Sequence, residues 1–204
     1  MALQKPAMTA NAERREAVIL NAELRNFTRF SEMLPPDKVL ELANDFFSLC
    51  GMAVTANAGK VLSVQNDALV AAFATGDRKG FAHKALKSAQ DLQREFGTLG
   101  EQWKKDYGLP AAISAAVHIG EAVFGMAGPI GHQQFVAFGD CVSITERLMH
   151  RARNGEVILS IDFMKALGVT AQTLGAEELP PLELHKRPAI PLYGIALEKR
   201  LDFT

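Results

Sequence analysis

The stretch from Val18 to Phe30, V-I-L-N-A-E-L-R-N-F-T-R-F, restricts the fold more than any other part of the sequence. It begins as a short apolar run, typical of a buried strand, and turns polar at Asn21-Ala22-Glu23. A carboxylate at the end of a buried strand is unfavourable unless a cationic group meets it. The polar turn that follows, Leu24 to Thr28, brings backbone amides together where a helix starts, which suits an anion. These features together suggest a metal-bound phosphate, but taken alone the stretch favours the simpler alternative, a strand end that carries a solvated glutamate.

Composition indicates one globular domain. The 204 residues, 48% hydrophobic and 22% charged, are enough for one sizeable core. A formal net charge of -1 gives no general attraction to nucleic acid or to a membrane surface, so phosphate recognition has to be local.

Cys50 and Cys141 lie in apolar helical patterns and are interpreted as buried thiols. We recognise neither an apolar run of membrane-spanning length nor a signal peptide, and we expect a cytoplasmic protein without membrane contact.

The order of elements follows from hydrophobic periodicity and turn residues. Residues 1–15 are expected to form a flexible tail or linker, and residues 16–204 a single domain. Asn66-Asp67 separates two β-rich runs and favours a tight hairpin with Asp67 at its tip. The pattern predicts helices at 31–58, 79–107, 139–151 and 161–167, and strands at 60–65, 68–74, 111–119, 133–138, 156–159, 182–184 and 190–197. The glycine-rich stretch 120–131 suggests a further strand and a turn. This order predicts an α+β fold with helices on one face of a mostly antiparallel sheet.

Glu23 and Asp67 are expected to meet at one end of this sheet. A β-α-β crossover returns the chain beside its first strand, so the hairpin can lie next to that strand. Two carboxylates placed close together repel each other unless a divalent cation or a shared proton joins them. Oxygen ligands favour Mg²⁺ or Mn²⁺, and the alternative is two independent exposed carboxylates.

At this pair the chain resembles the catalytic domains of class III adenylate and guanylate cyclases, over roughly residues 16–197. The family's F-A-D-I-R-G-F-T is similar to N-A-E-L-R-N-F-T here, and its G-D-A-L-M-A-V-F-G is similar to N-D-A-L-V-A-A-F-A. Its H-T-G-E-V-V-x-G-x-x-G resembles the run from His118 to Gly128. Its G-D-T-V-N-x-A-x-R-L resembles the run from Gly139 to Leu148. The four blocks occur in the family's order and spacing.

The resemblance implies a ferredoxin-like core that pairs head to tail, as a homodimer or as a heterodimer with another cyclase domain. Each active site then takes residues from both chains and converts ATP or GTP to the 3′,5′-cyclic nucleotide and pyrophosphate. It also implies two Mg²⁺ or Mn²⁺ ions per site, as in the two-metal-ion mechanism of phosphoryl transfer. The resemblance further implies that the protein takes part in intracellular signalling.

Particular residues follow from the aligned motifs. Glu23 stands at the first metal aspartate, Asp67 at the second, and Leu24 is included in the metal site. Arg147 stands at the arginine that stabilises the transition state, and Ser143 replaces its asparagine partner. The nucleotide positions are Asn26, Phe27 and Thr28 in the phosphate-facing turn, Lys186 at the loosely aligned phosphate lysine, and Ser63 and Val136 at the base-reading pair.

The departures from the family pattern leave two functions open. The extra methylene of Glu23 shifts its carboxylate by roughly 1 to 1.5 Å, and losing one preorganised donor at Ser143 typically lowers the rate by about 10²–10³. Ser63 and Val136 cannot read a purine edge as the family does. The chain is therefore either a cyclase, or a cyclase homology domain that dimerises, binds nucleotide or regulates a partner without turnover. His118, on an apolar strand, is interpreted as a structural core residue.

Overall fold

The computed structural model describes residues 12–129 and 131–196, so most of the expected tail and Leu197 lie outside the described residues. Residues 13–15 were expected in the tail, but they belong to the first strand, where they pair with the long strand that ends at Ala127. Along the chain the elements are β1 (Glu13–Arg25), α1 (Phe27–Met33), α2 (Pro36–Ala56), β2 (Lys60–Gln65), β3 (Ala68–Phe73), α3 (Arg78–Tyr107), β4 (Ala112–Ala127), β5 (Gln134–Phe138), α4 (Asp140–Met149), β6 (Glu156–Ser160), α5 (Ile161–Leu167), α6 (Ala171–Leu174), β7 (Glu177–Leu184) and β8 (Arg187–Ala196).

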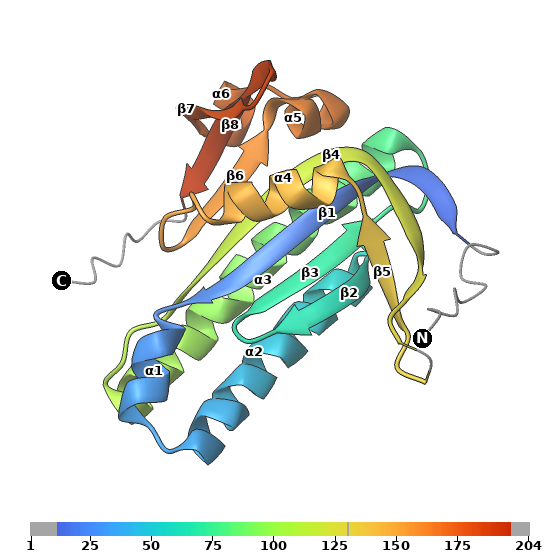
Figure 1. The fold of residues 1–204 in the computed structure, drawn as a ribbon. Coiled ribbons are helices and arrows are strands. Elements are labelled where there is room, and N and C mark those ends of the chain that lie inside the picture. Colours follow the sequence, from blue (N-terminus) through green and yellow to red (C-terminus); the bar gives the residue numbers. More distant parts are fainter. Residues whose placement is uncertain (1–11, 130, 197–204) are drawn as a thin grey trace.

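The strands form one sheet in the order β2-β3-β1-β4-β6-β8-β7, with β5 paired to β4 (Figure 1). The β4–β6 pairing is parallel and the other pairings are antiparallel. The α+β class and the mostly antiparallel sheet are thus confirmed. β1 is paired on one side with β3 and on the other with β4, so it is an inner strand of the sheet. Its side chains therefore point alternately to the two faces of the sheet, away from its edges.

The helices cover both faces of the sheet, which corrects the expectation of one covered face. Val18 and Leu20 of β1 join a core cluster with α2, α3 and α5, whereas Ile19 packs with Cys141 of α4. Successive strand side chains point to opposite faces, so α4 lies across the sheet from α2 and α3 (Figure 1). The sequence did not reveal this arrangement, because β1 is apolar on both of its faces.

Helix α2 is long and apolar enough to cross a membrane by length and composition alone, contrary to the expectation from sequence. Its buried side chains, among them Phe46, Cys50 and Val54, pack into the main core cluster. A core helix passes the same test of length and composition, so this property is weak evidence for a membrane span.

Two turns near the end of β1 each contain an asparagine in the left-handed region of backbone conformation. Asn66 adopts a positive φ of 53° in the β2–β3 turn, and Asn26 adopts 71° before α1. Both asparagines stand where the similar cyclase motifs have glycine, and asparagine tolerates the left-handed region better than most other residues. On β4, a Cβ at Gly120 would lie 2.9 Å from the Cβ of Cys141, so the glycine lets α4 approach the sheet closely.

Candidate active site

A cavity lies between the sheet and α4 at the end of β1 where Glu23 sits. Its floor is formed by the β1–β3–β2 ladders and its wall by α4 and the residue after it. Of the predicted site residues, the cavity brings together Glu23, Asp67 and Ser63. The other lining residues are Ile19, Asn21, Gln65, Asn66, Ala68, Val70, Val142, Thr145, Glu146, Met149 and His150.

Glu23 is held by Arg25, two residues further along the same strand face. The Arg25 Nη1 donates to Glu23 Oε1 at 2.5 Å, and both side chains are about four-fifths buried. The Arg25 Nε donates to Ser114 Oγ at 3.1 Å, and its Nη2 donates to the carbonyls of Met149 and Ala152, both at 2.9 Å. Arg25 is therefore the cation that neutralises the Glu23 carboxylate. Its guanidinium is held in place by Ser114 of β4 and by backbone carbonyls at and just after the end of α4. The motif alignment gave Arg25 no role.

Asp67 is placed beside Glu23 by its backbone. The Leu24 N–H donates to the Asp67 carbonyl at 2.8 Å, and Glu23 pairs with Ala68 in the β1–β3 ladder. The Asp67 side chain is half-buried, lines the cavity, and makes no hydrogen bond or ion pair within the described part of the chain. The predicted neighbourhood of the two carboxylates is confirmed.

The turn Asn26-Phe27-Thr28 is not among the residues that line this cavity. The Asn26 Nδ2 donates to the Pro110 carbonyl at 2.8 Å, and Phe27 packs against the main core cluster. Thr28 is exposed. Their role in phosphate binding stays a prediction.

Ser143, Arg147 and Lys186 lie on a different surface, formed by α4 and the β7–β8 hairpin. Ser143 and Arg147 are exposed, one helical turn apart, and neither lines the cavity. The Arg147 Nη2 donates to the Glu183 carbonyl of β7 at 2.8 Å. Lys186, exposed at φ 57° in the β7–β8 turn, precedes a residue that is bound to α4.

That residue is Arg187, which forms a two-pronged ion pair with Asp140 at the start of α4, with N–O distances of 2.6 and 3.0 Å. The hydrogen bond from the Arg187 guanidinium lowers the pKa of the Asp140 carboxyl below its ordinary value. The ion pair ties the hairpin that carries Lys186 to the helix that carries Ser143 and Arg147. The structure thus divides the predicted residues into a cavity group and an α4–hairpin group within one chain.

The predicted base-reading positions are also separated. Ser63 is an exposed residue of β2 and lines the cavity, whereas Val136 lies half-buried on β5, paired with Gly125 of β4, and does not line it. Neither side chain offers the pair of hydrogen-bonding groups with which a purine edge is read.

The donor set at the cavity is compatible with a hard divalent cation. Glu23 and Asp67 offer carboxylate oxygens. Leu24 is buried and does not line the cavity, and its N–H is used by the Asp67 carbonyl, so its part in the metal site stays a prediction. Across the described residues, no group of three His, Cys, Asp or Glu side chains converges on one point. The residues therefore fit Mg²⁺ or Mn²⁺ only as ions that take further ligands from water or substrate phosphate, the usual arrangement for Mg²⁺.

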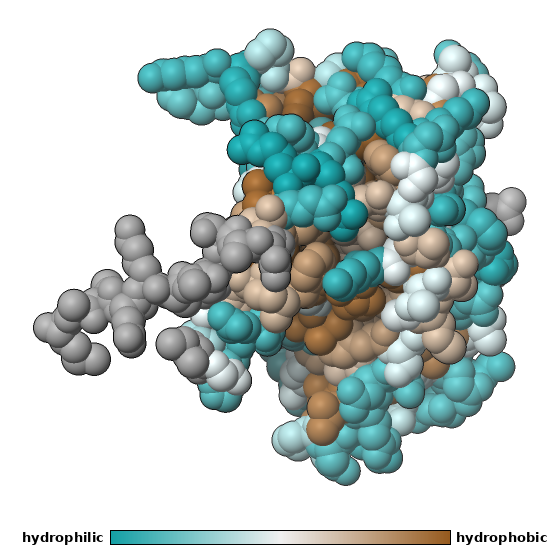
Figure 2. Space-filling model, turned by 90° about the vertical axis from the view of Figure 1, so that its right-hand side faces the viewer, coloured by the Kyte–Doolittle hydropathy of each residue, from teal (hydrophilic) through white to brown (hydrophobic). Residues whose placement is uncertain are grey.

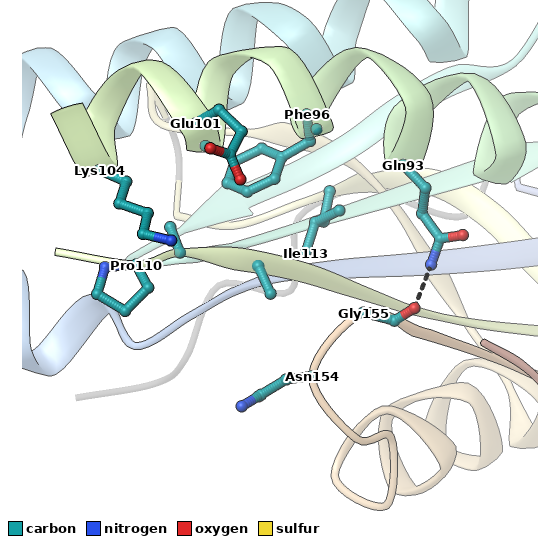
Figure 3. A pocket seen from close by; sticks show the side chains of 12 residues that line it. Gln93, Phe96, Glu101, Lys104, Pro110, Ile113, Asn154 and Gly155 are labelled. Carbon is teal, nitrogen blue, oxygen red and sulfur yellow. Dashed lines mark hydrogen bonds between the residues drawn. The ribbon is translucent and has the colours of Figure 1, made fainter. Parts of the chain in front are cut away.

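A second cavity lies between α3 and the start of β4, and it contains none of the predicted site residues (Figure 3). Phe96 and Ile113 form its apolar part, and Glu101 and Lys104 extend from α3 toward the strand (Figure 3). Gln93 Nε2 donates to the Gly155 carbonyl at 3.1 Å at its end. With one carboxylate and no second acidic ligand among its lining residues, it is not the candidate metal site.

His118 is a structural residue, as predicted. It is buried, and its Nδ1 lies 2.7 Å from Ser160 Oγ, the hydroxyl that caps α5 by accepting from the Phe163 N–H at 3.3 Å. Burial lowers the pKa of His118 below its ordinary value of 6.5, although the charges of Asp162 and Asp140 oppose this shift. The imidazole is therefore expected to be neutral in the folded protein at neutral pH.

We expect the free energy of unfolding to fall as the pH drops below about 6.5. The unfolded chain binds a proton at His118 more readily than the folded chain, so the stabilisation present above the unfolded pKa is lost as the pH falls through the lower folded pKa. Urea unfolding midpoints between pH 8 and pH 5 measure this, and His118→Gln should flatten the dependence. Identical pH profiles for the two proteins would contradict the assignment.

Comparison with known proteins identifies the family. The chain belongs to the adenylate and guanylate cyclase catalytic domain family, whose sequence profile matches residues 10–189. It is 27% identical over 138 residues to an adenylate cyclase of Anabaena cylindrica, covering 67% of this chain and 27% of that protein. It is also 27% identical over 170 residues to adenylate cyclase 2 of Rhizobium meliloti, covering 80% and 46%. The chain thus spans about a quarter to a half of these relatives.

Solved structures share the fold, which confirms the nucleotide cyclase fold expected from the motifs. The adenylyl cyclase CyaB from P. aeruginosa superposes with a TM-score of 0.83 at 18% identity, over 95% of this chain and 99% of that one. The guanylate cyclase domain of RhGC from Catenaria anguillulae, in complex with GTP, has a TM-score of 0.76 at 14% identity, over 92% and 100%. A guanylyl cyclase domain from the RhoGC fusion protein of Blastocladiella emersonii, described as a non-canonical dimer, has a TM-score of 0.73 at 13% identity, over 90% and 97%.

Proposed function

We propose that this chain is the catalytic domain of a class III nucleotide cyclase, a lyase that forms 3′,5′-cyclic AMP, or cyclic GMP, and pyrophosphate from ATP, or GTP. The observation that carries the proposal is the meeting of Glu23 and Asp67 in one cavity. The relatives named adenylate cyclases favour ATP as the first substrate to test. A cytoplasmic location and a role in intracellular signalling belong to the same proposal.

Glu23 and Asp67 would hold Mg²⁺ or Mn²⁺, two ions per site, with the Leu24 backbone carbonyl as the further predicted ligand. Bound ions would neutralise the triphosphate and favour ionisation of the ribose 3′-hydroxyl. Arg25 positions Glu23 and balances its charge before substrate arrives. Arg147 would stabilise the negative charge that develops on the phosphates, with Ser143 as a hydroxyl donor and Lys186 as a phosphate contact. Asn26, Phe27 and Thr28 would approach the phosphates through the turn before α1.

The active site is proposed to form in a head-to-tail homodimer. In one chain, Arg147 faces solvent on the α4–hairpin surface rather than the carboxylate cavity, so a second chain is needed to bring the two groups together. Figure 2 shows an apolar area on the face that looks to the right in Figure 1, framed by hydrophilic surface. Phe138 of β5, Met126 of β4 and Val64 of β2 are exposed large apolar residues. Exposed apolar surface of this kind often pairs with a partner.

A regulatory or nucleotide-binding module without turnover is the second candidate, and one contact favours it. Arg25 already neutralises Glu23 through a short ion pair, and a metal ion would have to share that carboxylate. A heterodimer, in which another cyclase domain supplies an intact metal site, is the corresponding assembly.

Cyclic nucleotide formation by the purified domain decides between these functions. The assay contains Mn²⁺ with ATP or GTP and a series of protein concentrations, with sedimentation measured in parallel. Product whose specific rate rises with dimer formation is the expected result. A stable dimer that forms no product with either nucleotide would overturn the catalytic proposal and leave the regulatory one.

Glu23→Asp is expected to raise turnover by roughly tenfold, a typical effect of metal-ligand positioning. The shorter side chain withdraws the carboxylate from Arg25 and restores the residue that the family motif carries. Initial rates with Mn²⁺ measure the change, and Glu23→Gln, which keeps the length and removes the charge, should lower turnover. Unchanged turnover in Glu23→Asp would mean that the rate is limited elsewhere, with Ser143 the first position to examine.

A further inference from the structure

Asn21 is a buried polar residue on the cavity floor, two residues before Glu23 on β1. It is 8% exposed, and its Oδ1 is buried without a hydrogen-bond partner among the residues that the structure describes. Ala17 and Ile19, the preceding residues on the same face, are apolar and pack in the cluster that includes Cys141 of α4. A buried amide that lacks a partner destabilises the folded chain, so this position is better filled by an apolar residue unless the amide has a ligand.

Strand register places Asn21 in line with the predicted base-reading position on β2. Asn21 pairs with Val70 of β3, and Val70 pairs with Ser63 of β2. Directly paired residues of antiparallel strands share one face of the sheet, so the three side chains form a row, and all three line the cavity. The next row toward the end of the sheet contains Glu23.

Asn21 supplies what the expected base readers lack. Val136 has no hydrogen-bonding group, and Ser63 has a single short hydroxyl. Thr145, another buried polar residue of the cavity wall, already donates its hydroxyl to the Cys141 carbonyl at 2.7 Å. The amide of Asn21 carries a donor and an acceptor side by side, and rotation about χ2 exchanges its two ends.

We propose that Asn21 recognises the purine base of the nucleotide, an inference that rests on the proposed nucleotide site. The amide pairs with a base edge that carries one donor and one acceptor next to each other. In adenine these are the N6 amine with a ring nitrogen, and in guanine they are N1–H with O6. Asn21 is therefore the residue that forms hydrogen bonds to the base edge in place of Ser63 and Val136.

The test compares Asn21→Leu with the matched control Ser88→Ala. Ser88 is the fully buried residue of α3 whose Oγ also lacks a partner among the described residues, and it does not line the cavity. Both substitutions remove an unpartnered buried polar group, so both should raise the urea unfolding midpoint. Only Asn21→Leu should lose the hydrogen bonds to the base edge.

Recognition of the base edge is measured by equilibrium dialysis in Mn²⁺, independently of turnover. One arm compares ATP with purine riboside triphosphate, which lacks the N6 amine, and the other compares GTP with 2-aminopurine riboside triphosphate, which lacks O6 and N1–H. The wild type should bind its preferred nucleotide about tenfold or more tightly than the matching analogue, because the ATP analogue loses one hydrogen bond to Asn21 and the GTP analogue loses two. This ratio should fall to near one in Asn21→Leu and persist in Ser88→Ala.

The outcomes separate this inference from the proposed catalysis. A ratio lost in Asn21→Leu supports base recognition even if no protein forms product. An unchanged ratio in Asn21→Leu, or a wild type that does not distinguish nucleotide from analogue, overturns it even if the domain is an active cyclase. A wild type that binds none of the four nucleotides overturns both proposals.

Discussion

Asp67→Ala is expected to lower cyclic nucleotide formation by at least about 10²–10³-fold without unfolding the domain, as loss of one preorganised electrostatic group does. The contact that fixes the hairpin beside β1 is the Leu24 N–H to the Asp67 carbonyl, which alanine retains. The carboxylate itself is used by no described structural contact, so its removal acts on the cavity. Initial rates with Mn²⁺ and ATP or GTP, together with urea unfolding midpoints, measure the two effects separately.

Asp45→Ala is the matched control, because Asp45 is an exposed carboxylate on α2 that does not line the cavity. It removes the same charge from the protein and should leave turnover unchanged. Full activity in Asp67→Ala would contradict the metal assignment. A parallel loss in both variants would indicate an effect of net charge rather than of the site.

Arg147→Ala is expected to lower turnover by a similar factor of about 10²–10³ through loss of transition-state stabilisation. The structural loss is small, because the side chain is exposed and its described contact is one hydrogen bond to the Glu183 carbonyl. Arg147→Lys keeps the charge and loses the guanidinium geometry, so a partial recovery of rate is expected. The kcat should fall more than the KM rises, because the interaction strengthens in the transition state.

Mixing Asp67→Ala with Arg147→Ala tests whether the two residues act across a dimer interface. Half of the randomly mixed dimers carry one defect on each chain, and each of these retains one intact site when the site takes Asp67 from one chain and Arg147 from the other. The mixture should therefore recover about a quarter of wild-type activity, the value for a two-fold dimer. No recovery, under conditions where subunits exchange, would contradict a site shared between chains.

Much of the fold could be predicted from residue patterns. The hairpin at Asn66-Asp67, the long helix that ends before Gly108 and the Ser160 cap each depend on local chemistry, namely a residue that tolerates positive φ, a helix stop and a side-chain acceptor. The packing of helices on both faces of the sheet could not be predicted. A strand that is apolar on both faces does not show which helix packs against which face. The extension of β1 to Glu13 also escaped prediction, since charged residues there are held by pairing with β4.

For the site, the sequence by itself determined the family motifs, and with them the carboxylate pair and the α4 arginine. Tertiary structure decided which of these residues share a cavity. It separated Glu23 and Asp67 from Arg147, and it showed Glu23 bound to Arg25, whose other partners come from β4 and the end of α4. It also revealed the unpartnered amide of Asn21, because satisfaction of a buried polar group depends on neighbours that are distant in the chain. Local residue patterns specify backbone conformation and motif spacing, whereas burial and long-range contacts arise only when the strands are assembled.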